Sequence, residues 1–502
     1  MIIWGFHFWD FVVIVVYLLT ITGIGMYTAK KVKTVGDFFL GGRKFGKLLT
    51  ASRDFALGTS TDEPVITVGQ SYTIGLPGIW FIMMNLFSTP LYWLIRPWFR
   101  RLRFYTMGDF CQMRLGKSFG YFYSFFGLLL TAVSMGLILK GTSSAVAGIT
   151  GGIVPLWAIV VVMATLFVLY GVAGGQFAAV FTNIFQAFFI VVLSVMLIPF
   201  CVIKAGGFTA ITRTINNPNF FNLFESSATG VNGLFILMVA LVSAPATMGD
   251  PNMATVIGKT EWETRMGMTN GMLVKRFCTI AWAFSGLFFL AVHPGIKVAD
   301  QVFGTAIATL LPVGLVGLMA GALMATAMSC CEGYMVIAAA YFLESFYKEM
   351  FKNKPEKHYL FVSRVASVVC AALSIIFALA FPTLVDLIMY AWVVPSFVGI
   401  VIWVALAWRR VNRYAAWATT IVCFVVQLCC NLYFSHHGYS KTQTFIWTGA
   451  IYLPLGLITL IVVSLMTPRE PQDNLDEFYA LLHTPIGQED RLKYAEVPIL
   501  HY

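Results

Sequence analysis

The chain has 502 residues, of which 59% are hydrophobic and only 11% are Asp, Glu, Lys or Arg. Soluble domains carry about a quarter charged residues, so this composition excludes a soluble enzyme, a disordered chain and a secreted disulfide scaffold. The net charge of +10 could reflect either a nucleic-acid partner or the topology of a membrane protein. We therefore predict an all-α polytopic membrane protein. The positions of the basic residues decide whether the net charge reflects a nucleic-acid partner or the membrane topology.

A helix that spans the bilayer needs roughly 20 mostly apolar residues. Segments of this kind predict about 13 transmembrane helices within residues 1–466. In chain order they cover 8–27, 49–74, 77–99, 119–148, 154–171, 177–203, 231–257, 270–292, 312–347, 359–381, 384–408, 411–433 and 444–466. The polar segment 467–502 follows them, and we expect it to lie on the surface as a cytoplasmic tail.

The basic residues lie mostly on one side of the predicted membrane. With the N-terminus placed outside, 27 Lys and Arg fall in the inside loops and tail and 4 fall in the outside loops. The inside count includes Lys275 and Arg276, which lie near one end of the span 270–292, and only Arg53 and Lys140 are counted as lying within spans. This asymmetry predicts a cell (inner) membrane protein with its N-terminus outside and its C-terminus in the cytoplasm. Because the basic residues are spread over many loops, the sequence indicates no nucleic-acid partner, and it shows no sign of an obligate protein partner.

Two of the predicted spans contain helix-breaking residues. The second span carries GTSTDEP at 58–64, and the seventh carries SAPATMGDPN at 243–252. Backbone that is left unpaired at membrane depth is tolerated only where it lines a cavity in the protein. Two interrupted spans, five apart, are typical of a secondary transporter with inverted repeats, which predicts one repeat over about 49–203 and the other over about 231–408. The alternative is that one of these stretches is a re-entrant loop or a long connector.

Five short motifs occur in order between residues 8 and 466. They are DFFLGGR at 37–43, YTMGDF at 105–110, the stretch at 170–186 with a Gly pair and Thr-Asn, GDPN at 249–252 and ATAMS at 325–329. Together they resemble motifs of the sodium:solute symporter family, which includes sodium/proline, sodium/pantothenate and sodium/sugar symporters. The resemblance implies a leucine-transporter-type fold of five plus five helices, with one extra N-terminal and two extra C-terminal helices. It also implies sodium-coupled uptake of a small organic solute by alternating access.

The resemblance further implies a sodium site between the first broken helix and the span that carries the ATAMS motif. Carried over by position, the ligands are the backbones of Ala56, Thr59 and Thr326 and the side chain of Ser329. The second hydroxyl position of the family holds Cys330 here, and Asn183 stands where the family has an aspartate. Because a thiol is a poor ligand for a hard cation, three alternatives stay open: coupling to protons, an uncoupled transporter and a transport-fold sensor.

Ionisable residues inside predicted spans indicate functional sites, because a charge at the bilayer centre costs about 3 kcal/mol or more. Asp62 and Glu63 at the first break, Lys140 in the fourth span and Asp250 at the second break are our candidates for solute binding. A carboxylate pair with free backbone groups suits a cation or a cationic group of the solute. The alternative is an ion pair within the protein. Lys140 could contact a carboxylate of the solute, or neutralise Glu63 or Glu332.

Glu332 is a further candidate for the ion site. It lies three residues after Ser329, so both share one helix face. We expect it to restore the negative charge that Asn183 and Cys330 do not supply, or to carry a proton. The alternative is that Glu332 pairs with Lys140 or snorkels toward the membrane surface.

Thr182, Asn183 and Gln186 are candidates for coupling or gating. Thr182 and Gln186 are four residues apart, so they share a helix face and can hydrogen-bond between helices. The seven His lie at span ends, in loops and in the tail, without a metal-binding pair. We therefore expect no enzyme activity and no cofactor beyond the coupling ion, Na⁺ or H⁺, and the expected partners are the solute and the lipid bilayer.

Overall fold

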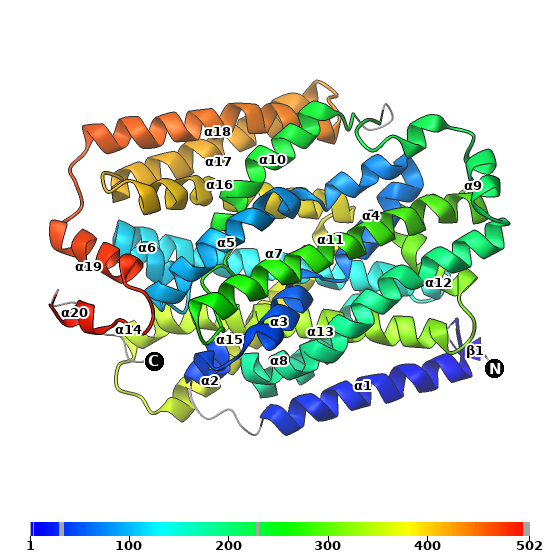
Figure 1. The fold of residues 1–502 in the computed structure, drawn as a ribbon, viewed down its shortest axis with the longest axis horizontal. Helices are drawn as coiled ribbons and strands as arrows, with labels where there is room; N and C mark the ends of the chain where they lie inside the picture. Colours follow the sequence, from blue (N-terminus) through cyan, green and yellow to red (C-terminus); the bar gives the residue numbers. More distant parts are fainter. Residues whose placement is uncertain (1, 4, 30–34, 227–229, 495–502) are drawn as a thin grey trace.

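The computed structural model describes residues 2–3, 5–29, 35–226 and 230–494, with only the backbone given for 2–3, 29, 35, 84–85, 169–178 and 493–494. Helices account for most of these residues and lie side by side in an elongated bundle (Figure 1). Ten of the described helices are long and apolar enough to cross a membrane. The prediction of an all-α polytopic membrane protein is confirmed.

The first half of the chain begins with a small antiparallel hairpin of β1 (Ile2–Ile3) and β2 (Phe6–His7). The helices that follow are α1 (Phe8–Ala29), α2 (Val35–Leu40), α3 (Lys47–Gly58), α4 (Asp62–Ile74), α5 (Met84–Leu102), α6 (Met107–Leu115), α7 (Lys117–Ile149), α8 (Leu156–Ala205) and α9 (Phe208–Ile215). Short 3₁₀ turns η1 (Gly41–Arg43), η2 (Leu76–Phe81) and η3 (Pro218–Phe221) connect some of them.

The second half is again helical. Its helices are α10 (Gly233–Met248), α11 (Glu261–Val292), α12 (Val302–Leu310), α13 (Leu315–Phe342), α14 (Lys348–Met350), α15 (Glu356–Ala380), α16 (Leu384–Ala407), α17 (Arg413–His436), α18 (Lys441–Met466), α19 (Gln472–His483) and α20 (Asp490–Tyr494). A short turn, η4 (Ala299–Gln301), precedes α12, and a single π turn, η5 (Leu343–Tyr347), joins α13 to α14.

Two of the expected span boundaries differ from the structure. Segments 154–171 and 177–203 form one continuous helix, α8. The eighth span begins at Glu261, earlier than the expected residue 270, because Thr260 and Glu263 form a capping box in which each side chain accepts the other residue's backbone N–H. The polar first turns of α11 therefore belong to the helix and not to a loop.

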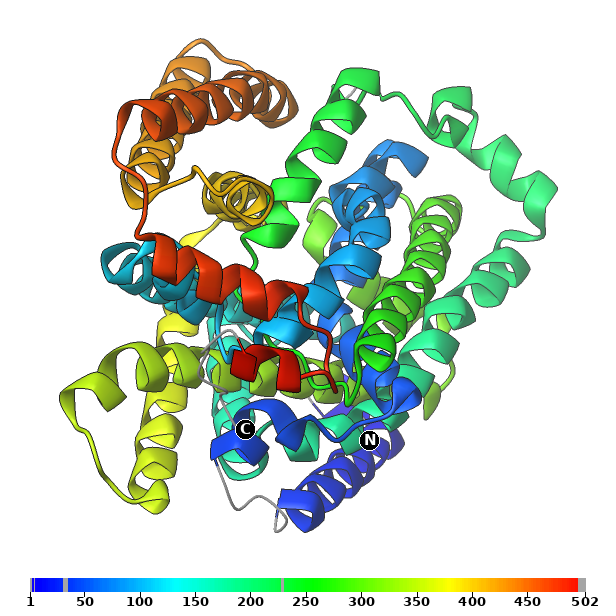
Figure 2. The same cartoon turned by 60° about the vertical axis from the view of Figure 1, so that its left-hand side comes forward.

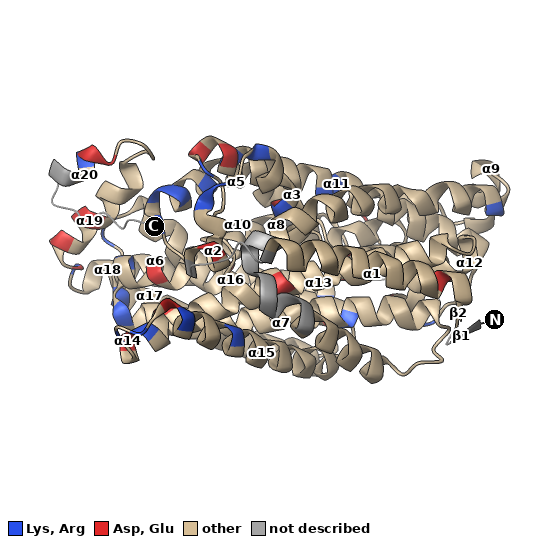
Figure 3. Cartoon of the chain, turned by 90° about the horizontal axis from the view of Figure 1, so that it is seen from below, with Lys and Arg blue, Asp and Glu red and all other residues tan. Residues whose placement is uncertain are grey.

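Two basic residues of α11 do not lie in a loop. Lys275 and Arg276, which the charge count assigned to an inside loop, lie within α11 and are only 2% and 5% exposed. Arg96 and Arg100 in α5 are also buried. Lys and Arg nevertheless gather at the end of the bundle where α5, α14 and α20 lie (Figure 3).

Both predicted helix interruptions are present. The first helix of the broken pair, α3, ends at Gly58, and α4 begins at Asp62, with Thr59 in a non-helical conformation between them. Pro64 lies in the first turn of α4, where a missing N–H removes no helical bond. In the second case α10 ends at Met248, and residues 249–258 form turns and extended chain before α11.

The interior of the bundle consists of α7, α11, α13 and α16, whose apolar segments are at least 67% buried. The helices α1, α15, α17 and α18 have segments that are at most 28% buried. Their outward side chains are large and apolar, such as Leu19 and Met466, which is the surface that a lipid bilayer covers. Figure 2 shows α17 and α18 side by side at the edge of the molecule.

The described part of the expected tail is more than a polar surface segment. In α19, Leu475, Phe478 and Leu482 recur at helical spacing, and all three are buried. Tyr479 donates a 2.7 Å hydrogen bond from its hydroxyl to the Ala405 carbonyl of α16. Segment 467–494 therefore covers one end of the bundle with an amphipathic helix. The polar composition of the segment as a whole gave no indication of this helix.

Ion pairs hold this segment to the bundle. The pairs are Arg103 with Glu489, Arg409 with Asp476 and Arg413 with Glu470. The backbone N–H of Gly487 and the charge of Arg103 lower the pKa of Glu489 below its usual value, so that its carboxylate stays ionised near neutral pH.

Candidate functional site

Two cavities flank the break between α3 and α4. The larger cavity, of about 160 Å³, lies between this break and residues of α5, α7, α10, α11, α13 and α16. The smaller cavity, of about 30 Å³, lies between the same break and residues of α8, α11, α12 and α13. The break therefore faces a cavity on each side, as unpaired backbone at membrane depth requires.

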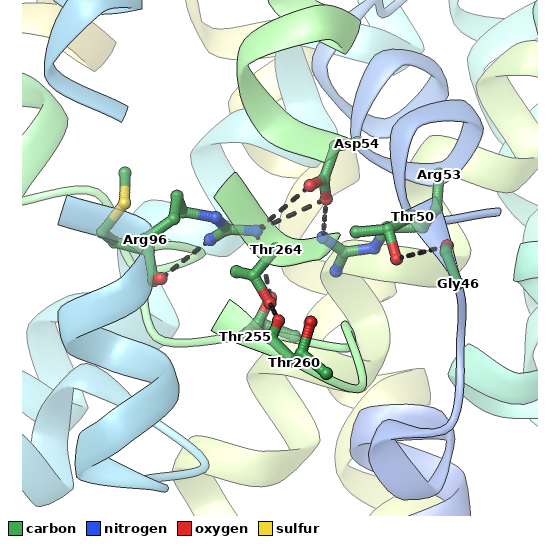
Figure 4. A network of polar contacts seen from close by, with 9 residues as sticks. Gly46, Thr50, Arg53, Asp54, Arg96, Thr255, Thr260 and Thr264 are labelled. Carbon is green, nitrogen blue, oxygen red and sulfur yellow. Dashed lines mark hydrogen bonds and ion pairs between the residues drawn. The ribbon is translucent and has the colours of Figure 1, made fainter. Parts of the chain in front are cut away.

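A buried charge cluster lines one part of the larger cavity. Arg53 donates to Asp54 at 2.7 Å, and Arg96 approaches the same carboxylate at 3.4 Å. Figure 4 shows Asp54 pointing toward both guanidinium groups. Arg96 also donates to the Met253 carbonyl at 2.9 Å, so this Arg53–Asp54–Arg96 triad connects α3 and α5 to the chain that follows α10. All three residues are at most 2% exposed.

A second ion pair lies at the break itself. Glu63, in the first turn of α4, pairs with Lys275 of α11. The Lys275 ammonium group also donates to the carbonyl of Gly58, the last residue of α3. The partner of Glu63 is therefore Lys275 and not Lys140. Sequence reasoning missed Lys275 because the charge count assigned it to an inside loop, although it lies within the expected span 270–292. A basic residue inside a span was the signal that could have found it.

Several acceptors around the larger cavity lack partners. Within the described part of the chain, Asp62 Oδ1, Glu63 Oε2 and Asn252 Oδ1 are buried without a hydrogen bond. Asp250 accepts a 2.7 Å bond from the Asn252 backbone N–H. Because buried acceptors are nearly always satisfied, this surplus indicates a place for a ligand group that donates hydrogen bonds.

The expected sodium ligands lie close to the smaller cavity, and two of them contact the unusual residues. Thr59 and Thr326 line this cavity. The carbonyl of Ala56 accepts the thiol of Cys330 at 3.1 Å. Ser329 donates from its hydroxyl to the Asn183 side chain. Cys330 and Asn183 therefore each hold one of the oxygens that the family resemblance assigns to the ion.

Two of the expected site residues lie elsewhere. Lys140 donates to the carbonyls of Ala378 and Phe381 near the end of α15 and lines neither cavity. Glu332 is 1% exposed, is absent from both cavity walls and has one carboxylate oxygen, Oε2, without a hydrogen bond among the described residues. The structure therefore brings Asp62, Glu63 and Asp250 together but leaves Lys140 and Glu332 outside that group.

The three expected coupling residues lie along α8. Gln186 donates to the Ala325 carbonyl of α13 at 3.0 Å, and Asn183 contacts Ser329 of the same helix. Thr182 donates back to Ala179 within α8 at 3.0 Å. Two of these three side chains therefore hydrogen-bond to the helix that carries Thr326.

A helical membrane bundle with a broken central helix and charged residues at the break defines a secondary transporter. Residues 38–423 match the model of the sodium:solute symporter family, and the chain belongs to that family. It is a transporter that couples the uptake of a small organic solute to sodium by alternating access.

Relatives of known function cover most of the chain. The high-affinity proline transporter PutP of Bacillus subtilis is 24% identical, covering 91% of this chain and 98% of that relative. The sodium/glucose cotransporter of Vibrio parahaemolyticus is 23% identical, covering 74% of this chain and 75% of that relative. These relatives carry different solutes by name, proline and glucose. The solute of this chain must therefore be inferred from its own site residues.

Solved structures show the same fold. A substrate-bound, outward-open Na⁺-coupled sialic acid symporter superposes with a TM-score of 0.77 at 19% identity, covering 93% of this chain and 99% of that one. The nucleobase-cation-symport transporter Mhp1 gives a TM-score of 0.54 at 13% identity, covering 88% and 98%. Both neighbours are transporters of the leucine-transporter-type fold.

Proposed function

We propose that this symporter takes up a small solute that carries a protonated amine, bound in the larger cavity. The observation that carries this proposal is the set of buried oxygens without hydrogen bonds around the larger cavity, on Asp62 and Glu63 at the first helix break and on Asn252 at the second. An ammonium group has three donors and no acceptor, which suits such a surface.

The charges around the larger cavity support an amine over a neutral solute. Its cationic groups already have carboxylate partners, Arg53 and Arg96 in Asp54 and Lys275 in Glu63. No ion pair to Asp62 or Asp250 occurs among the described residues. A neutral sugar would satisfy hydrogen bonds but would leave both carboxylates without a counter-charge.

The sodium ion is proposed to bind beside the smaller cavity. Thr59 and Thr326 line it, and Thr59 Oγ1 has no hydrogen bond among the described residues. Ala56, Ser329 and Cys330 would complete the ligand set, with Asn183 replaced as a partner of Ser329 when the ion binds. Glu332 would supply a remote negative charge, and a proton on Glu332 is the alternative coupling ion.

The proposed layout follows the family. Thirteen spans in all, with repeats over about 49–203 and 231–408 and a tail from 467, require the chain to reverse direction within α8, between Leu156–Val168 and Ala179–Ala205. The Lys and Arg at the α5, α14 and α20 end support a cytoplasmic C-terminus and an outside N-terminus (Figure 3).

Asp62→Asn tests the solute assignment. We expect uptake of an amine solute to fall roughly 10–100-fold, because a buried hydrogen bond to a charged group contributes about 1.5–3 kcal/mol. The measurement is sodium-driven uptake by proteoliposomes of labelled amino acids, amines and sugars. Asp476→Asn, on the exposed surface of α19, is the matched control. Selective uptake of a neutral sugar that is insensitive to Asp62→Asn would contradict the proposal.

Cys330→Ser tests the sodium assignment. A hydroxyl oxygen is a better sodium ligand than a thiol, so we expect half-maximal uptake at a sodium concentration about fivefold lower, the effect of roughly 1 kcal/mol. Cys331→Ser, the adjacent buried cysteine, should leave this concentration unchanged. Equal responses of the two variants would remove Cys330 from the ion site.

A further inference from the structure

We propose that the Lys275 ammonium group is a tethered cation. It occupies a cation site formed by the Gly58 carbonyl and the Glu63 carboxylate, and without the lysine this site binds a free monovalent cation. Its residues line the larger cavity, whereas Thr59 and Thr326 line the smaller one, and the inference does not depend on which solute is carried.

The two oxygens come from opposite sides of the helix break. Gly58 is the last residue of α3, so its carbonyl has no helical partner and lies at the negative end of the helix dipole. Glu63 lies in the first turn of α4. Lys275 donates to both of them. Carbonyl and carboxylate oxygens are the donors that hard cations use in proteins, so the lysine occupies a position whose chemistry suits an ion.

The burial of this pair gives the lysine a strong electrostatic role. The side chains of Lys275 and Glu63 are 2% and 10% exposed. Removing one partner of a buried pair leaves an uncompensated charge, which is strongly unfavourable. A neutral residue at 275 would therefore leave a buried carboxylate and a free helix carbonyl in need of a cation.

A replacement cation has a route to the site. Gly58, Glu63 and Lys275 all line the larger cavity, so shortening the lysine enlarges that cavity at the position of the ammonium group. The surroundings are otherwise tight, since a Cβ on Gly58 would meet Met272 Cε at 2.2 Å. The space opened by Lys275→Ala is thus confined and lies beside both oxygens.

Arg276 is the competing source of positive charge. It is 5% exposed, and its guanidinium nitrogens have no hydrogen bond among the described residues. It lies within electrostatic range of Glu63 but donates no hydrogen bond to it in the structure. If Arg276 moved to Glu63 when Lys275 is removed, no free cation would be needed. The unfolding temperature of Lys275→Ala would then respond to cations as that of the wild-type protein does.

The tethered cation has a consequence for coupling. A fixed ammonium group joins α11 to both halves of the broken helix without being loaded or released in each cycle. Only the site at the smaller cavity then exchanges sodium, and the sodium dependence of uptake should have a Hill coefficient of about 1.

The experiment compares the wild-type protein with Lys275→Ala, Lys275→Arg and the neutral double variant Glu63→Gln/Lys275→Met. Thermal unfolding of the purified full-length protein is measured in choline chloride with added Na⁺ or methylammonium, and uptake is measured in proteoliposomes against sodium concentration. We expect methylammonium and Na⁺ to raise the unfolding temperature of Lys275→Ala much more than that of the wild-type protein. Uptake by Lys275→Ala should recover with methylammonium or high sodium, with a Hill coefficient of about 2 for sodium.

The other two variants are controls. Lys275→Arg keeps the charge and should show no added cation dependence. The double variant removes both the cation and its carboxylate and should show none either. The proposal is overturned if Lys275→Ala responds to cations as the wild-type protein does, or if the double variant responds as Lys275→Ala does. Thermal unfolding is measured without solute. The comparison of Lys275→Ala with the wild-type protein can therefore be interpreted even if the solute is not an amine.

Discussion

Replacing Asp54 by asparagine is expected to destabilise the protein by roughly 3–5 kcal/mol, the usual cost of removing one partner from a buried ion pair. Asp54 is the carboxylate that Arg53 and Arg96 share, at 2.7 and 3.4 Å. The substitution leaves two positive charges facing each other in the interior. Since Arg96 also binds the Met253 carbonyl, the loss should loosen the chain after α10 as well as α3.

Thermal unfolding in detergent measures this effect. Asp476→Asn breaks the exposed pair with Arg409, whose side chains are 51% and 56% exposed, and should cost at most about 1 kcal/mol. Both substitutions remove a carboxylate that is paired with arginine. The difference between their effects on stability therefore measures the contribution of burial. Equal shifts in unfolding temperature would show that the Arg53–Asp54–Arg96 triad does not stabilise the fold.

Replacing Gly399 by alanine is expected to prevent the close packing of α10 on α16. A Cβ at position 399 would lie 1.7 Å from the Pro245 carbonyl oxygen, and one at Gly249 would lie 1.9 Å from that of Pro395. Backbone atoms cannot rotate away, so the helices must separate, which costs roughly 3 kcal/mol or more. The second helix break begins at this contact, so uptake should also fall severely.

Gly23→Ala is the matched control. This residue lies within α1, and a Cβ there would meet no atom within 4 Å. Alanine is the better helix former, so we expect unchanged uptake and a stability gain of about 0.5–1 kcal/mol. If Gly399→Ala unfolds at the same temperature as Gly23→Ala and transports solute at the wild-type rate, the close helix contact is not required.

The helix breaks could be predicted from the sequence because their causes are local. Gly58 and Pro64 in one span, and Pro245 and Pro251 in another, act on the backbone of their own segments. The start of α11 was also a local signal, the capping box at Thr260, but its polar residues were read as a loop. Lys275 lies within the expected span 270–292 but was counted with an inside loop, so Lys140 was considered as the partner of Glu63 and Lys275 was not.

The sodium site was predictable by position but not in its contacts. Cys330 and Asn183 were recognised as departures from the family pattern. Their hydrogen bonds to the Ala56 carbonyl and the Ser329 hydroxyl depend on how α3, α8 and α13 pack. Only that packing shows that both residues contact the proposed ligands.

The low charge fraction and the asymmetry of the basic residues determined by themselves that this is a polytopic helical membrane protein. Hydropathy and helix breaking are properties of short segments, so they can be read along the chain. The tertiary structure decided which charges meet, because Glu63 and Lys275 are 212 positions apart and Lys140, the nearer candidate, lies against α15. Partners of buried charges depend on which helix faces pack together, and no local pattern records that choice.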